Sequence, residues 1–260
     1  MNDRSYERLM IAFLLVVIVI QAVFAAFPGI DLAVSGHFAN GTAGFAWNTG
    51  PLQTVNLVLR RLAELLAVGL VLWCILGGLT GKLRGDALTA WAYAASVVVL
   101  ASGVIANLLL KGHIGRARPV SVAEFGGELH FTPAWQITDQ CAHNCSFASG
   151  EVSLAASLSI AAVVLFWPRL KNARWRFMAI VVATAYVGLI MLLRIGLGRH
   201  FLSDTIFAVL FSGAVALALY PLMRVSRARL AFDPQLPVLV CRRQYEKGRA
   251  QAQAWLKRAT

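Results

Sequence analysis

The uncharged run ALTAWAYAASVVVLASGVIANLLL occupies residues Ala87 to Leu110 and is followed directly by Lys111. A helix rises about 1.5 Å per residue, so about 20 apolar residues cross the roughly 30 Å hydrocarbon core of a bilayer. An apolar run of this length that ends at a cation is typical of a membrane-spanning helix. This stretch therefore predicts a membrane protein.

Five further apolar runs lie on either side of this one. The six predicted spans are Leu9 to Phe27, Ala63 to Leu79, Ala87 to Leu110, Val152 to Trp167, Phe177 to Leu193 and Thr205 to Met223. The fourth and fifth runs are short, and we expect each to gain about a turn at its ends.

The composition of the whole chain agrees with a membrane protein. The 260 residues are 58% apolar and 14% charged, with a mean hydropathy of +0.68. Soluble domains are about half apolar and a quarter charged, and disordered chains are poorer still in apolar residues. We predict an all-α, polytopic membrane protein with a six-helix domain at residues 1–223 and a basic tail at residues 224–260.

The first run has a second interpretation. It follows Arg4 and Arg8 and ends near Ala25 and Ala26, which is also the pattern of a cleaved signal peptide. Cleavage there would leave five spans.

The net charge of +12 indicates orientation, not nucleic-acid binding. Most of the 24 Lys and Arg lie in short segments beside the apolar runs, without the interleaved aromatic residues that stack on bases. Cytoplasmic loops of membrane proteins are enriched in Lys and Arg, which predicts cytoplasmic N- and C-termini. Seven cations then remain on the outer, periplasmic side: Arg60, Arg61, Lys111, Arg116, Arg118, Arg194 and Arg199.

Polar residues gather at span ends that share one membrane face. They follow the third span, begin the fourth, end the fifth and begin the sixth, and they are Lys111, Arg118, Ser149, Gly150, Glu151, Arg194, His200 and Asp204. Lys and Arg neutralise phosphate oxygens, and free amides at a helix N-terminus bind anions. A carboxylate four residues after a His can hold one ring nitrogen and leave the other as nucleophile or base. The pattern predicts an oxyanion site with a reactive histidine.

Three motifs on this face resemble those of a known family. The segment KGHIGRARP at 111–119 matches K-x6-R-P, RIGLGRHFLSD at 194–204 matches R-x5-H-x3-D, and ASGE at 148–151 partly matches P-S-G-H. Together they are similar to the three motifs of the type 2 phosphatidic acid phosphatase (PAP2) superfamily. The resemblance implies an all-α enzyme that hydrolyses phosphate esters through a phosphohistidine, without a metal or another cofactor.

The resemblance also assigns roles to individual residues. It implies that His200 is the nucleophile and that Asp204 orients it. The phosphoryl oxygens would be held by Lys111, Arg118, Arg194, Ser149 and the amide of Gly150.

Glu151 is the main departure from the family pattern, because it replaces the histidine that protonates the leaving group. A protonated Glu151 would do this work if a low dielectric raised its pKa, but a helix N-terminus and nearby cations oppose this. Alternatively, His143 supplies the proton, or Glu151 only orients an arginine. The other departures, Ala148 for Pro and Leu193 for Ser, remove at most one hydrogen-bond donor.

The remaining candidates in these loops have lesser roles. Arg116 is an auxiliary candidate that we interpret as a head-group contact or a solvated loop residue. Arg199, next to His200, is either a substrate-side cation or a solvated residue. Cys141 and Cys145 lie in the same outer loop, where a periplasmic location permits a disulfide. A Cys-x-His-x-Cys half-site for zinc has no accompanying ligand pair, so we expect no metal.

Two segments outside the motifs also carry predictions. Residues 27–38 resemble a short amphipathic helix at the membrane interface, which either admits a lipid or packs as a lid. The basic tail either binds anionic lipid or remains solvated.

The expected function is hydrolysis of a phosphate monoester or pyrophosphate of a membrane lipid at the periplasmic face of the bacterial inner membrane. The 1- or 4′-phosphate of lipid A is favoured, with undecaprenyl pyrophosphate, phosphatidylglycerophosphate and phosphatidate as other substrates. A lipid phosphotransferase of the same fold, an inactive phosphate-binding relative and a transporter are the alternatives. A transporter would distribute polar residues through the depth of its spans, whereas here they gather at one face.

Overall fold

A computed structural model of the chain describes residues 3–259, and this part of the chain contains helices and no strands. Within it, six helices are long and apolar enough to cross a membrane, as predicted. They are α1 (Asp3–Ala26), α3 (Gly50–Leu79), α4 (Gly85–Val98) with its extensions η1 (Val99–Leu110) and α5 (Lys111–His113), α6 (Gly150–Phe166), α7 (Ala173–Gly196) and α8 (Leu202–Leu222). The shorter elements are α2 (Gly29–Gly36), η2 (Pro119–Ser121), η3 (Ala123–Phe125), η4 (Trp167–Arg169), α9 (Val225–Ala228) and the long tail helix α10 (Leu236–Ala259).

The main difference from the predicted spans is the start of α3. This helix begins at Gly50 instead of Ala63. Charged residues such as Arg60 and Arg61 interrupt the apolar run, but they are good helix formers, so the helix continues through them. Helix α7 is extended at both ends relative to the predicted fifth span, as expected. Helix α6 begins two residues before the predicted fourth span and ends at Phe166, where η4 continues to Arg169.

Helix α6 lies at the centre of the bundle, where it contacts α3, α4, η1, α7 and α8. Its buried face is rich in small residues, which allow close helix packing. Ser153 and Ser157 on this face lie 3.1 and 3.2 Å from the Ser212 hydroxyl of α8. Hydrogen bonds of this kind stabilise helix pairs inside a membrane.

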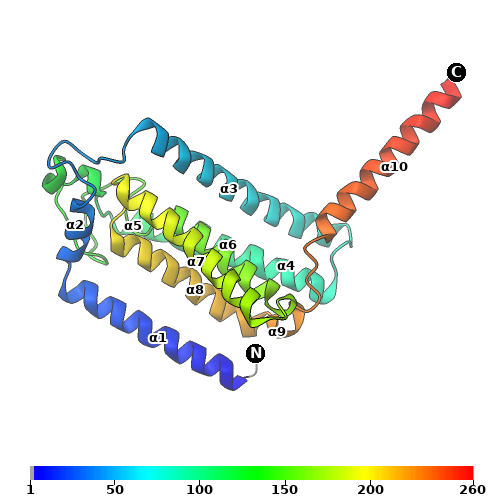
Figure 1. Cartoon of the computed structure of the whole chain (residues 1–260), viewed down its shortest axis with the longest axis horizontal. Coiled ribbons are helices and arrows are strands. Elements are labelled where there is room, and N and C mark those ends of the chain that lie inside the picture. Colours follow the sequence, from blue (N-terminus) through cyan, green and yellow to red (C-terminus); the bar gives the residue numbers. More distant parts are fainter. Residues whose placement is uncertain (1–2, 260) are drawn as a thin grey trace.

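Helices α1 and α3 flank the packed α4, α6, α7 and α8 on opposite sides (Figure 1). The contact of α1 with α8 includes a hydrogen bond of 2.9 Å from the Tyr6 hydroxyl to the Leu217 carbonyl, and the rings of Phe24 and Phe207 lie 6.1 Å apart. The first apolar run is thus packed as a helix of the bundle.

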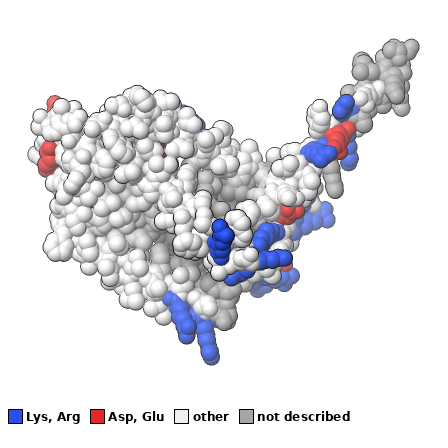
Figure 2. Space-filling model, in the orientation of Figure 1, with Lys and Arg blue, Asp and Glu red and all other residues white. Residues whose placement is uncertain are grey.

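The two ends of the bundle differ in charge. The broad face in Figure 2 has almost no charged residues, and Lys and Arg gather toward α9 and α10 at one end. The packed core continues past residue 223 at this end, because Val225, Ala228 and Phe232 are buried against α4 and its neighbours.

At the opposite end, α2 and α5 lie beside the start of α6, the end of α7 and the start of α8 (Figure 1). Helix α2 confirms the predicted short helix, but it buries a polar face, including Asp31 and Ser35, against the bundle. The buried face of α2 thus packs against the start of α8.

Candidate active site

His200 lies in the turn between α7 and α8 and is almost completely buried, with 1% of its surface exposed. Its Nδ1 lies 2.7 Å from the carbonyl oxygen of Ser146. A carbonyl only accepts, so Nδ1 carries the proton and the lone pair of Nε2 is free. This tautomer suits a nucleophile.

The predicted contact between His200 and Asp204 is not a direct hydrogen bond. The nearest approach, between Nδ1 and Oδ2, is 3.7 Å. The Asp204 carboxylate instead accepts hydrogen bonds from Arg116 at 2.6 Å, the Ser146 hydroxyl at 2.5 Å and the Phe201 amide at 2.8 Å. These donors draw the carboxylate away from the ring, and Asp204 reaches His200 through Ser146.

The surroundings of His200 keep its ring neutral. Burial lowers the pKa of His200 to about 3; Asp204 opposes this, and the nearby charges of Arg194 and Lys111 act in the same direction as burial. A neutral imidazole with a free Nε2 can attack phosphorus without first losing a proton.

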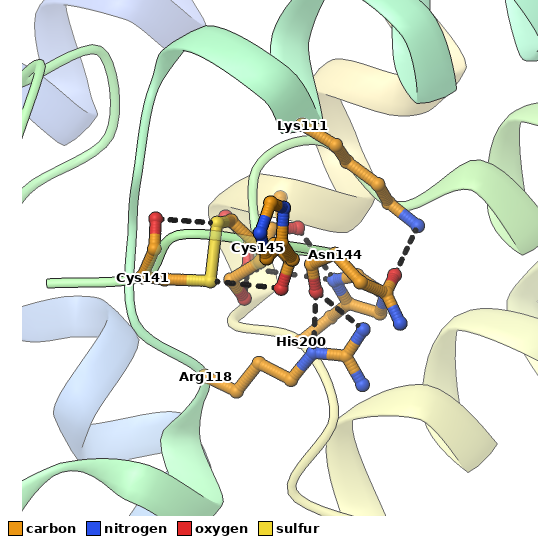
Figure 3. Close-up of a disulfide and its surroundings, with 9 residues drawn as sticks. Lys111, Arg118, Cys141, Asn144, Cys145 and His200 are labelled. Carbon is orange, nitrogen blue, oxygen red and sulfur yellow. Dashed lines mark hydrogen bonds and ion pairs between the residues drawn. A yellow bond between two sulfur atoms is a disulfide. The ribbon is translucent and has the colours of Figure 1, made fainter. Parts of the chain in front are cut away.

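The three predicted phosphate-binding cations, Lys111, Arg118 and Arg194, line one cavity of about 570 Å³. Lys111 and Arg118 approach Asn144 from two sides, with His200 close by (Figure 3). Lys111 Nζ lies 3.5 Å from Asn144 Oδ1, and Arg118 donates to the Asn144 backbone carbonyl at 2.7 and 3.2 Å. The pKa of Arg118 is lowered by burial and by the charge of Arg199.

Ser149 and Gly150 begin α6 beside these cations. Ser149 is the N-cap, and its hydroxyl accepts from the Val152 amide at 3.4 Å. Gly150 lines the cavity, and a Cβ at this position would collide with the side chain of Asn107. A larger residue at this position would therefore displace the side chain of Asn107, which donates to the Ser102 carbonyl at 2.8 Å.

Glu151 forms ion pairs with two arginines. Its Oε2 lies 3.0 Å from Arg194 NH1, and its Oε1 lies 3.6 Å from Arg60 NH1. Arg60 projects from α3 and also bonds Glu64 at 2.7 Å. Of the three roles considered for Glu151, this geometry favours the one in which it orients an arginine.

Arg116 differs from its predicted role. It is not a solvated loop residue or a head-group contact, because none of its surface is exposed. Its guanidinium bonds Asp31, Ser203 and Asp204, and it also donates to the Thr132 carbonyl at 2.8 Å. A cation that cannot leave the interior must be paired, and here the fold supplies two carboxylates.

The other auxiliary candidates lie at the margin of the site. Arg199 is half-buried, and His143 is exposed in the loop between Cys141 and Cys145. These two cysteines form a disulfide with a Cα–Cα distance of 5.6 Å. Among residues 3–259, no three His, Cys, Asp or Glu side chains are grouped to hold a metal ion.

Several site residues were not identified from the sequence: Asp31, Arg60, Asn144, Ser146 and Ser203. The only signal was that Arg60 is a cation on the outer side. The others are ordinary loop or helix-end residues, and their contacts depend on segments far away in the chain.

Comparisons with known proteins agree with this site. The family model described as PAP2 superfamily matches residues 91–228. The lipid A 4′-phosphatase of Francisella tularensis subsp. novicida is 29% identical over 77% of this chain and 89% of its own length. The lipid A 4′-phosphatases of Rhizobium etli and Rhizobium leguminosarum are each 31% identical over 77% of this chain, and over 82% and 90% of their own lengths. No solved structure matches this chain significantly.

The family match covers all three motifs and the helices that bring them together. Within the matched region, Lys111, Arg118, Arg194 and Gly150 line one cavity, and His200 lies close to Arg118 and Asn144 (Figure 3). The chain therefore belongs to the PAP2 superfamily.

Proposed function

We propose that this multi-pass membrane phosphatase removes the 4′-phosphate of lipid A at the periplasmic face, through a phosphohistidine on His200. The observation that carries the substrate class is the shape of the cavity of about 570 Å³. One part is lined by Lys111, Arg118 and Arg194, and another by apolar residues of two helices. The printed names of the three relatives support the choice of lipid A and of its 4′ position.

The apolar part of the cavity suits the body of a lipid. It is lined by Val68, Val71 and Leu72 of α3 and by Val98 and Val99 at the junction of α4 and η1. These residues lie along membrane-spanning helices. A phosphate held by the cations would thus belong to a molecule whose apolar part lies against α3 and α4.

The proposed reaction has two displacements at phosphorus. His200 Nε2 attacks, the bond from phosphorus to the lipid oxygen breaks, and the lipid oxygen leaves and takes a proton from solvent water. The hydroxide formed, or a water that gives its proton to solvent, then attacks the phosphohistidine, the P–N bond breaks, and inorganic phosphate leaves. Lys111, Arg118, Arg194 and the amides at the start of α6 would stabilise the negative charge of both transition states.

The proposed orientation follows from charge. Lys and Arg gather toward α9 and α10 (Figure 2), which supports a cytoplasmic location for that end. The site lies at the other end of the bundle, which would then face the periplasm, where the disulfide loop would also be stable.

The test is phosphate release by purified protein in detergent with EDTA. The substrates are lipid A, undecaprenyl pyrophosphate, phosphatidylglycerophosphate and phosphatidate, and the enzymes are wild type and His200→Ala. We expect EDTA-resistant release from lipid A by wild type only, with mass spectrometry locating the loss at the 4′ position. Preference for another lipid would refute the substrate, and wild-type rates in His200→Ala would refute the nucleophile.

A further inference from the structure

We propose that Asp31 of α2 is a positioning residue for His200, acting through Arg116 and Asp204. This inference rests on the proposed role of His200 as nucleophile. It assigns a catalytic contribution to a helix that lies outside the three motifs and outside residues 91–228.

Asp31 is held in a buried network. With 1% of its surface exposed, its carboxylate accepts from the Ser203 amide at 2.8 Å, the Ser203 hydroxyl at 2.5 Å and Arg116 NH2 at 2.8 Å. Ser203 is the second residue of α8, directly before Asp204. These bonds join α2 to the start of the helix that follows His200.

Arg116 connects Asp31 with Asp204. Its NH1 lies 2.6 Å from Asp204 Oδ1, and its NH2 lies 2.8 Å from Asp31 Oδ2. The ring of Phe201 lies 4.4 Å from the guanidinium carbon. One cation is thus shared between two carboxylates in a site without exposed surface.

Asp204 connects Arg116 to His200 through Ser146. Its Oδ2 accepts from the Ser146 hydroxyl, and the Ser146 carbonyl fixes Nδ1 of His200. The same Oδ2 lies 3.7 Å from that nitrogen. The imidazole orientation therefore depends on where Arg116 and Asp31 hold Asp204.

The charge of the network also matters for the reaction. Burial and the charge of Asp204 raise the pKa of Asp31, whereas Arg116 and Ser203 oppose this. With both carboxylates ionised, one guanidinium between them leaves one net negative charge beside His200. When Nε2 bonds to phosphorus, the imidazole gains positive charge, which this negative charge stabilises. Without Asp31, Arg116 would neutralise Asp204 completely, and the stabilisation would be lost in the transition state but not in substrate binding.

The experiment compares Asp31→Asn and the milder Ser203→Ala with Asp86→Asn. Asp86 is a matched control because it pairs with Arg227 on the surface of α4, away from this network. We expect kcat at least about tenfold lower in Asp31→Asn and about threefold lower in Ser203→Ala, with KM within about twofold of wild type. Asp86→Asn should keep the wild-type kcat.

Binding of inorganic vanadate and inorganic phosphate, measured by calorimetry, supplies a readout that needs no lipid. Vanadate bonded to Nε2 mimics the five-coordinate transition state, whereas phosphate mimics the ground state. Asp31→Asn should bind vanadate at least about tenfold more weakly and phosphate within about twofold. A purely structural role would weaken both equally.

The outcomes separate this inference from the proposed function. Wild-type protein that binds vanadate no more tightly than phosphate would refute the role of His200. Failure to cleave lipid A with normal vanadate binding would refute only the substrate. Wild-type kcat and vanadate affinity in a folded Asp31→Asn protein would overturn the role of Asp31. If Asp31→Asn does not fold, the same result in Ser203→Ala overturns it.

Discussion

Replacing Glu151 by Gln tests how this enzyme works with a carboxylate in place of the family's proton-donating histidine. The change removes one charge and keeps the length of the side chain and an oxygen acceptor. In the structure, that charge lies 3.0 Å from Arg194 NH1 and 3.6 Å from Arg60 NH1. Both carboxylate oxygens are used by arginines, so we expect Glu151 to orient them instead of donating a proton.

The size of the effect follows from these contacts. A hydrogen bond to a charged group contributes about 1.5–3 kcal/mol, and a neutral one about 0.5–1.5 kcal/mol. The contact that holds Arg194 in position therefore becomes weaker by about 1–2 kcal/mol. Removing the carboxylate also removes its repulsion of the incoming phosphate, which is about 1 kcal/mol or more at 4 Å. The two effects oppose each other, and kcat and KM should each change by less than about tenfold.

The assay is phosphate release at saturating lipid, repeated with an aryl phosphate whose leaving group needs no proton. Loss of a general acid costs about 10²–10⁴-fold in kcat. A fall of more than a hundredfold with lipid, absent with the aryl phosphate, would refute our reasoning and make Glu151 the acid. Glu64→Gln is the matched control, since Glu64 pairs with Arg60 and Arg61 but not with Arg194.

Three further predictions concern the same end of the bundle. Because burial lowers the pKa of His200 to about 3, its ring should stay neutral as the pH falls through 6.5. Its contribution to the stability of the folded protein should be lost as the pH falls from 6.5 to 3. A ¹⁵N NMR titration of His200 with a midpoint near 6.5 would contradict this. Gly150→Ala should lower kcat/KM at least about tenfold, because the added methyl collides with Asn107. Gly188→Ala is the control, since Gly188 has open space around it, and it should keep the wild-type kcat/KM. Equal kcat/KM values for the two variants would contradict the close approach of Asn107 to Gly150. Cys141→Ser opens a disulfide that closes a short loop and should lower the free energy of unfolding by about 2 kcal/mol. An unchanged denaturation midpoint would argue against this.

The amino-acid sequence by itself determined the class of the protein and the end of the bundle that carries the chemistry. Hydropathy is a local property, so runs such as Ala87 to Leu110 identify spans without knowledge of their neighbours. Successive spans cross the membrane in opposite directions, so the end of one span and the start of the next lie on the same membrane face. That argument was sufficient to bring Lys111, Arg194 and His200 together.

Tertiary structure alone decided the partners of the buried charges. Arg116 and Asp31 are 85 residues apart, and no local pattern distinguishes a buried loop arginine from a solvated one. The same holds for the pairing of Glu151 with Arg60, which depends on how α3 packs against α6. His200 Nδ1 donates to the Ser146 carbonyl and not to the Asp204 carboxylate, because helix spacing predicts proximity but not which groups compete for the hydrogen bonds. Hydropathy and motif spacing depend only on residues that are close in the sequence. The pairing of buried polar groups depends on which distant segments the fold packs together.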